Sequence, residues 1–179
     1  DFEADENDPA SYDFAFTDWL LNSIDAQSCK IFYRLGTTIE NSQHIKAYRI
    51  YPPKDYEKWA RICEHVIMHY NEGWADGFHY NIKYWEIWNE PDNDPDPLKN
   101  RMWRGTMEEY FELYGVASKY LKDKFPHQMI GGYASCGFYD LKKSFVANAN
   151  SSPRKEYFIV FFKRFLEYIT ANKCPLDFF

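Results

Sequence analysis

An alternation of strand-like and helix-like segments is the feature that most constrains how this chain folds. Segments rich in β-branched and aromatic residues occur at 30–39, 82–89 and 128–136, and residues 176–179 begin like another. Segments with helical periodicity alternate with them: 13–25, Pro52-Pro53 to Gly73, Thr106 to Pro126, and a stretch that starts at Ser152-Pro153. Strands and helices in this order form right-handed βαβ units, so the sequence predicts an α/β protein with a parallel sheet.

Three of the predicted helices carry more specific signals. In 13–25 four apolar side chains recur at helical spacing and are expected to form the buried face: Phe16, Leu20, Leu21 and Ile24. Pro52-Pro53 is expected to open the second helix, because proline suits the first turn. Thr106 is followed three residues later by Glu109, which is the pattern of a capping box at the start of the third helix.

Charge and short motifs exclude several classes of protein. The net charge of −6 argues against nucleic-acid binding, and no apolar run is long enough to span a membrane. The glycine patterns GxGxxG and GxxxxGK(S/T) are both absent, which weakens any nucleotide-binding interpretation. No CxxC pair or Cys/His cluster indicates zinc, and the four cysteines are expected to be free thiols. His65 and His69 lie one turn apart on a helix expected outside the sheet, so neither a metal nor another cofactor is predicted.

The stretch YWEIWNEPD, residues 84–92, is the most unusual part of the sequence. Asn89 and Glu90 are poor strand formers, yet they end an aromatic strand directly before Pro91. In a (β/α)8 barrel, functional residues sit where strands end, and the loops after residues 39 and 136 lie at equivalent places. One chemistry that such a pair could perform is cleavage of a glycosidic bond. This reaction needs a carboxylic acid as proton donor, as Glu90 could be, and an amide such as that of Asn89 can bind a sugar hydroxyl. A polar strand end without function remains the alternative.

Strand alternation predicts which side chains share a face. Tyr84, Glu86, Trp88 and Glu90 are expected on one face, and Trp85 and Ile87 on the apolar face that packs against helices. In the preceding strand, Arg34 falls on the face that corresponds to Glu86. A buried carboxylate needs a partner, so we expect Arg34 and Glu86 to pair at hydrogen-bond distance.

The residues also carry a family resemblance. Trp88-Asn89-Glu90-Pro91 resembles the WNEP motif of clan A retaining glycosidases, and the wider sequence resembles glycoside hydrolase family 39, which holds β-xylosidases and α-L-iduronidases. Three stretches support it: YRLGTTIEN, KYWEIWNEPDN and MIGGYASC. The resemblance implies that residues 1–179 are a fragment of a single catalytic domain. It implies a partial (β/α)8 TIM barrel with strands 3 to 5, their flanking helices and the edge of strand 6.

The resemblance implies roles for matching residues only. Glu90 would be the general acid/base, Asn89 would bind the sugar 2-hydroxyl, and Trp88 would help shape the pocket. Family members take their nucleophile, a second Glu, from the end of the seventh strand, which this chain does not reach. Glu40 and Glu86 match no such role, so the chain alone is expected to be inactive.

The implied partner is a carbohydrate. Acidic residues 1–8 and 92–96 at the expected mouth favour a neutral glycoside such as a β-xyloside over an anionic one. Exposed barrel edges are expected to favour self-association. Two alternatives stay open: a non-catalytic carbohydrate-binding barrel or remnant, and another clan A specificity such as an endo-glucanase or mannanase.

Overall fold

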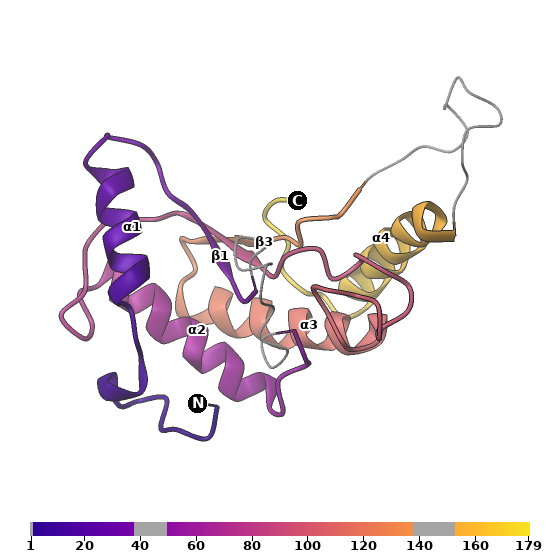
Figure 1. Ribbon diagram of the computed structural model, residues 1–179, viewed down its shortest axis with the longest axis horizontal. Helices are drawn as coiled ribbons and strands as arrows, with labels where there is room; N and C mark the ends of the chain where they lie inside the picture. Colours follow the sequence, from indigo (N-terminus) through magenta and orange to yellow (C-terminus); the bar gives the residue numbers. More distant parts are fainter. Residues whose placement is uncertain (1, 38–49, 138–152) are drawn as a thin grey trace.

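The computed structural model describes residues 2–37, 50–137 and 153–179 (Figure 1). Glu40 and the loop after residue 39 lie outside this range. Helices and strands follow one another in the predicted order: η1 (Pro9–Ser11), α1 (Ala15–Asp25), β1 (Phe32–Leu35), α2 (Tyr56–Asn71), β2 (Tyr84–Ile87), α3 (Met107–Lys124), β3 (Met129–Gly131) and α4 (Pro153–Ala171). The strands are shorter than predicted.

The three strands form one parallel sheet in the order β1-β2-β3. Phe32 pairs with Tyr84, and Tyr84 pairs with Met129, so the strands start level with one another. Residues 176–179 are not a strand, but they run along β3 and bond to it. Asp177 N donates to Ile130 O at 2.9 Å, and Gly132 N donates to Phe178 O at 3.2 Å. The predicted fold class, an open part of a (β/α)8 barrel, is confirmed.

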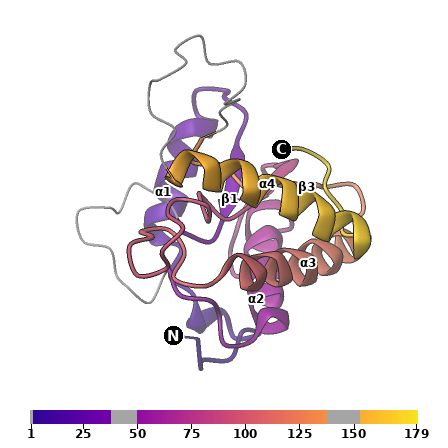
Figure 2. The ribbon, with the colours of Figure 1, turned by 90° about the vertical axis from the view of Figure 1, so that its right-hand side faces the viewer.

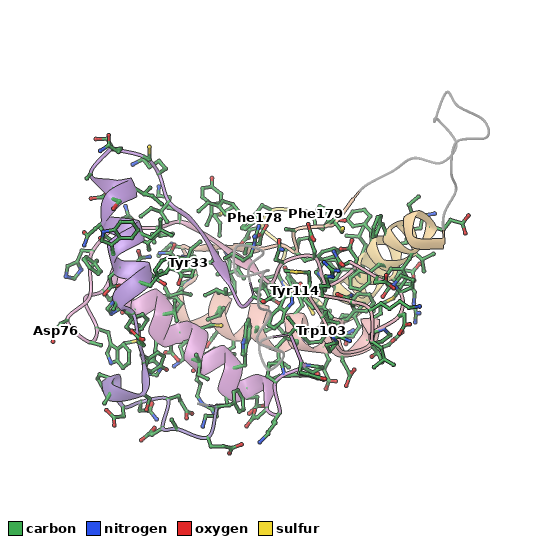
Figure 3. All side chains as sticks on the ribbon, viewed as in Figure 1. Tyr33, Asp76, Trp103, Tyr114, Phe178 and Phe179 are labelled. Carbon is green, nitrogen blue, oxygen red and sulfur yellow. The ribbon has the colours of Figure 1, made fainter. Side chains whose placement is uncertain are left out.

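Helices cover one face of the sheet. In Figure 1, α2 and α3 lie below the strands, and Figure 2 shows α4 packed beside α3. Trp85 and Ile87 are fully buried between the sheet and these helices, as strand alternation predicts. The Tyr114 hydroxyl on α3 donates to Pro175 O at 2.8 Å, which ties α3 to the segment after α4 (Figure 3).

The helices begin where local capping chemistry dictates. Asp55, and not Pro52-Pro53, caps α2, because its side chain accepts from Lys58 N at 2.9 Å. The predicted capping box of α3 is confirmed: Glu109 N donates to Thr106 Oγ1, and the Glu109 side chain accepts from Thr106 N.

The predicted buried face of α1 is wrong for two of its four residues. Leu21 is buried, but Phe16 is 73% exposed and Leu20 is 40% exposed. The pattern identifies an apolar side of the helix, but of its four residues Leu21 joins the core and Ile24 packs against it. Asp18 on α1 accepts hydrogen bonds from the Tyr70 hydroxyl and pairs with His69 Nε2, each at 3.0 Å. His69 therefore has a structural partner inside the fold.

The structure also describes the cysteines, the arrangement of possible metal ligands and the apolarity of the helices. The four cysteines all lie in the described residues and form no disulfide with one another, and Cys63 is buried. The described residues contain no group of three or more His, Cys, Asp or Glu side chains that could hold a metal ion. Within the same residues, no helix has the length and apolarity needed to cross a membrane.

Candidate active site

The backbone leaves the extended conformation at the carboxyl end of β2. Trp88 has a φ of 72° and Glu90 a φ of 45°, both in the left-handed region that non-glycine residues rarely adopt. The flanking backbone is still paired with its neighbours. Trp88 N donates to Leu35 O at 2.8 Å, and Glu90 N donates to Ala134 O at 2.7 Å. Asn89 between them forms a parallel bridge with Ala134. The end of β2 therefore has a left-handed backbone, here called the curl, and backbone hydrogen bonds fix it to the neighbouring segments at Leu35 and Ala134.

This curl overturns the predicted orientation of Trp88. Its ring does not share the face of Glu86. It packs on Trp59 of α2 and on Trp103, with ring centroids 6.0 and 5.1 Å away, and the side chain is 2% exposed. Its Nε1 donates to Met102 O at 2.8 Å. The left-handed φ rotates the side chain into the helix-facing core, which simple alternation does not anticipate.

The predicted pair between Arg34 and Glu86 is confirmed. Arg34 Nε lies 2.5 Å from Glu86 Oε2, and the two residues are register partners on β1 and β2. The pair lies on the sheet face opposite the helices. The same face carries Phe32, Tyr84 and Phe178, whose rings contact one another. Glu86 is therefore engaged in a structural ion pair.

Glu90 lies half-buried where the turn after β2 begins. Asn93 holds it in two ways: its backbone N donates to Glu90 O at 3.0 Å, and its Nδ2 donates to Glu90 Oε2 at 3.1 Å. The same Nδ2 lies 3.4 Å from Cys136 Sγ. The Glu90 carboxylate is thus fixed at the carboxyl edge of the sheet, the edge where barrel enzymes carry their chemistry.

Asn89 directly precedes Glu90 and is 4% exposed. Its Nδ2 is buried, and no described protein atom accepts a hydrogen bond from it. Leaving a buried donor unsatisfied costs on the order of 1–3 kcal/mol, so such a group calls for an explanation. An acceptor supplied by a ligand or a water would satisfy it.

Sequence reasoning missed Asp92. The acidic residues of 86–96 resemble a solvated loop, but Asp92 is completely buried. Its Oδ2 accepts from Ser135 Oγ at 2.6 Å, and its Oδ1 accepts from Cys136 N at 2.9 Å. Burial raises the pKa of Asp92 to about 6, against the lowering effect of these two hydrogen bonds. Its place just after Pro91, at the strand end, was the available signal.

Asn100 was also missed. Its Nδ2 donates to Pro91 O at 2.9 Å, and its Oδ1 accepts from Met102 N and Trp103 N at 2.8 and 2.9 Å. These bonds fold the loop between β2 and α3 back under the strand end. Because they link residues that are several positions apart in an irregular loop, no periodic pattern reveals them.

The class of protein follows from the sheet and from its carboxyl edge. The open parallel sheet with helices on one face is part of a (β/α) barrel, and the edge carries a candidate active site with the fixed Glu90 carboxylate beside the buried Asn89 amide. Comparison with known proteins identifies the family. The family model described as glycosyl hydrolases family 39 matches residues 2–179, and the chain belongs to this family.

Curated relatives of the chain include two β-xylosidases. The one from Geobacillus stearothermophilus is 30% identical over 137 residues, which cover 72% of this chain and 26% of the relative. The one from Caldicellulosiruptor saccharolyticus is 36% identical over 94 residues, which cover 51% and 17%. The chain therefore spans about a quarter or less of the length of these relatives.

Solved structures show the same fold. A glucosidase from Croceicoccus marinus matches with a TM-score of 0.73 and 29% identity, over 99% of this chain and 31% of its own. A monomeric β-xylosidase from Caulobacter crescentus matches with a TM-score of 0.60 and 21% identity, over 93% and 29%. The second likeness supports the fold alone.

Proposed function

We propose that the protein to which residues 1–179 belong is a retaining, β-xylosidase-like glycoside hydrolase, and that these residues are part of its single catalytic domain. Glu90 is its general acid/base. The observation that carries the proposal is the position of Asn89 directly before Glu90 at the carboxyl end of β2, where the buried Asn89 Nδ2 has no acceptor among the described residues. Family membership and the names of the curated relatives support it.

The chemistry follows from two carboxyl groups. Protonated Glu90 gives its proton to the bridging oxygen as that oxygen's bond to the anomeric carbon breaks, while a second carboxylate bonds to the same carbon. Glu90 then takes a proton from water, whose oxygen displaces the second carboxylate and releases the sugar. Glu86 does not supply this second group, because Arg34 engages it. The resemblance to the family implies a Glu at the end of the seventh strand of the barrel, and we propose the same source here.

Asn89 and Trp88 have supporting roles in this proposal. The Asn89 Nδ2 donates to the sugar 2-hydroxyl, a bond that strengthens as positive charge develops on the ring and contributes several kcal/mol. Trp88 helps to shape the pocket from the helix side of the sheet. Its buried ring packs against Trp59 and Trp103 and so supports the left-handed strand end that carries Asn89 and Glu90.

The choice of sugar rests on the relatives more than on charge. Of the eight acidic residues near the expected mouth, three form ion pairs in the described part of the chain: Glu3 with Lys54, Glu6 with Arg61 and Asp96 with Lys99. These pairs reduce the repulsion of an anionic sugar only in part. A neutral β-xyloside is the proposed substrate. A β-glucoside is the first alternative substrate to assay, because one structural relative is a glucosidase.

The test is a leaving-group series with the full-length protein that contains this chain. Glu90→Gln cannot donate a proton, so kcat/KM should fall roughly 10²–10⁴-fold on a phenyl xyloside, whose departure needs protonation. It should fall far less on a dinitrophenyl xyloside, whose leaving group departs without help. Glu167→Gln is the matched control, because Glu167 is exposed on α4. Wild-type rates for Glu90→Gln on both substrates would refute the proposal.

A carbohydrate-binding protein without catalysis is the second candidate, because the unsatisfied Asn89 donor suits binding equally well. Such a protein needs Asn89 and not the acidity of Glu90. It would show xylo-oligosaccharide binding by calorimetry that Glu90→Gln leaves unchanged, with no release of either aryl group by the wild-type protein.

A further inference from the structure

The turn after β2 is joined to the segment after β3 by a series of contacts. Glu90 N donates to Ala134 O at 2.7 Å, and Asn93 Nδ2 lies 3.4 Å from Cys136 Sγ. Between these two contacts lies Asp92, whose two oxygens accept from Ser135 Oγ and Cys136 N. Residues 90–93 and 134–136 therefore form one unit at the carboxyl edge of the sheet.

Asp92 makes the charge-assisted hydrogen bonds that join the two segments of this unit. It is fully buried, and its carboxylate takes one hydroxyl and one backbone N–H at 2.6 and 2.9 Å. Hydrogen bonds to an ionised acceptor are about twice as strong as those between neutral groups. Among the described residues, no Lys or Arg forms an ion pair with it, so hydrogen bonds alone compensate its burial.

The link bears directly on Glu90. Asp92 is two residues along the chain from Glu90, and Asn93, the next residue, donates to the Glu90 carboxylate at 3.1 Å. Any rotation of the turn moves Asn93 and Glu90 together relative to β3. A misplacement of about 1 Å in a proton donor can cost on the order of 10²-fold in rate.

We propose that Asp92 is a positioning residue for Glu90: by holding Ser135 and the Cys136 N–H, it fixes the turn that aims the acid/base at the bridging oxygen. This inference rests on the proposed function of Glu90. It assigns Asp92 no contact with substrate and no proton transfer, only control over where the proton donor sits.

Burial also affects the protonation of Asp92. It raises the pKa of this carboxyl to about 6, and the neighbouring Glu90 charge acts in the same direction. Among the described residues, burial raises the pKa of three tyrosine hydroxyls and the Asp92 charge adds to the increase: Tyr110 of α3, Tyr133 after β3 and Tyr157 of α4. Because the held and buried carboxyl binds a proton more tightly than a solvent-exposed one would, a fall in pH through about 6 does not by itself release the turn. The positioning role is therefore tested by substitution.

The experiment compares Asp92→Asn with Asp94→Asn in the full-length protein, using the phenyl and dinitrophenyl xylosides. Asp94 is a matched control in the same loop, because an amide oxygen can still accept from Asp96 N. For Asp92→Asn, kcat on the phenyl xyloside should fall about 10- to 100-fold with little change in KM, and the dinitrophenyl rate should change less than about 3-fold.

Ser135→Ala is the second variant, in case Asp92→Asn folds poorly. It removes one of the two donors and keeps the Cys136 N–H, so the same selective loss should appear at about 3-fold or more. An equal loss on both substrates, or an Asp92→Asn protein that matches Asp94→Asn, would overturn the positioning role. If Glu90→Gln itself shows no leaving-group dependence, the proposed function and this inference both fail.

Discussion

Gly36 and Trp88 meet where β1 and β2 end, and together they set the shape of the site. Gly36 has a φ of +97°, and a Cβ there would lie 2.5 Å from the Trp88 ring. Only glycine adopts this left-handed φ without strain and also has no Cβ to collide with the ring. The absence of a side chain at Gly36 leaves room for the Trp88 ring in the core, and the left-handed turn at Trp88 then delivers Asn89 and Glu90 to the sheet edge.

At the same scale, the Arg34–Glu86 pair makes a stability prediction. Arg34→Met leaves the Glu86 carboxylate, 11% exposed, without its partner. Removing one member of a largely buried pair is strongly destabilising, and partial exposure of Arg34 reduces the effect. We expect the free energy of unfolding, measured by urea titration, to fall by about 1–3 kcal/mol.

The matched control for that prediction is Lys54→Met. Lys54 pairs with Glu3 at the surface, where the side chains are 78% and 68% exposed. An exposed ion pair in water contributes little to stability, so this variant should stay close to the wild-type protein. Equal losses from Arg34→Met and Lys54→Met would show that the inner pair adds nothing to stability.

At the scale of elements, local chemistry was predictable and tertiary placement was not. The capping box of Thr106 and Glu109 involves residues three apart, so the sequence contains the whole interaction. The Trp88 orientation depends on Gly36, and the burial of Asp92 depends on Ser135 and Cys136, more than forty residues away. The pairing of Arg34 with Glu86 lies between these two cases. The residues are far apart in sequence, but the parallel register and the alternation of side chains place them together once the strands are known.

The start of α3 provides the element-scale prediction. Thr106 is exposed, so Thr106→Ala removes the cap and little packing. We expect the free energy of unfolding to fall by about 1 kcal/mol, since the Glu109 N–H loses its acceptor. Thr170→Ala, at an exposed position in the last turn of α4, should change stability by less than about 0.5 kcal/mol. An unchanged midpoint for Thr106→Ala in thermal unfolding followed by circular dichroism would contradict the capping argument.

At the scale of the whole molecule, the sheet has one covered face and one open face. On the open face Phe32 is 53% exposed and Tyr84 is 42% exposed, although their rings stack on each other with centroids 5.8 Å apart. Exposed aromatic groups on an open sheet face favour association, so self-association of the isolated chain stays a prediction. The Croceicoccus marinus glucosidase extends well beyond this part, since the chain covers 31% of its length.

The last prediction concerns catalysis by residues 1–179 alone. A retaining mechanism needs two carboxyl groups about 5–5.5 Å apart. Of the described carboxylates closest to Glu90 along β2 and its turn, Glu86 pairs with Arg34 and Asp92 is buried against Ser135 and Cys136, so neither is available as a nucleophile. We therefore expect the isolated chain to release no dinitrophenol from the xyloside above the level of its Glu90→Gln variant, while the full-length protein does. Turnover by the chain that Glu90→Gln abolishes would mean that a second carboxylate exists within these residues.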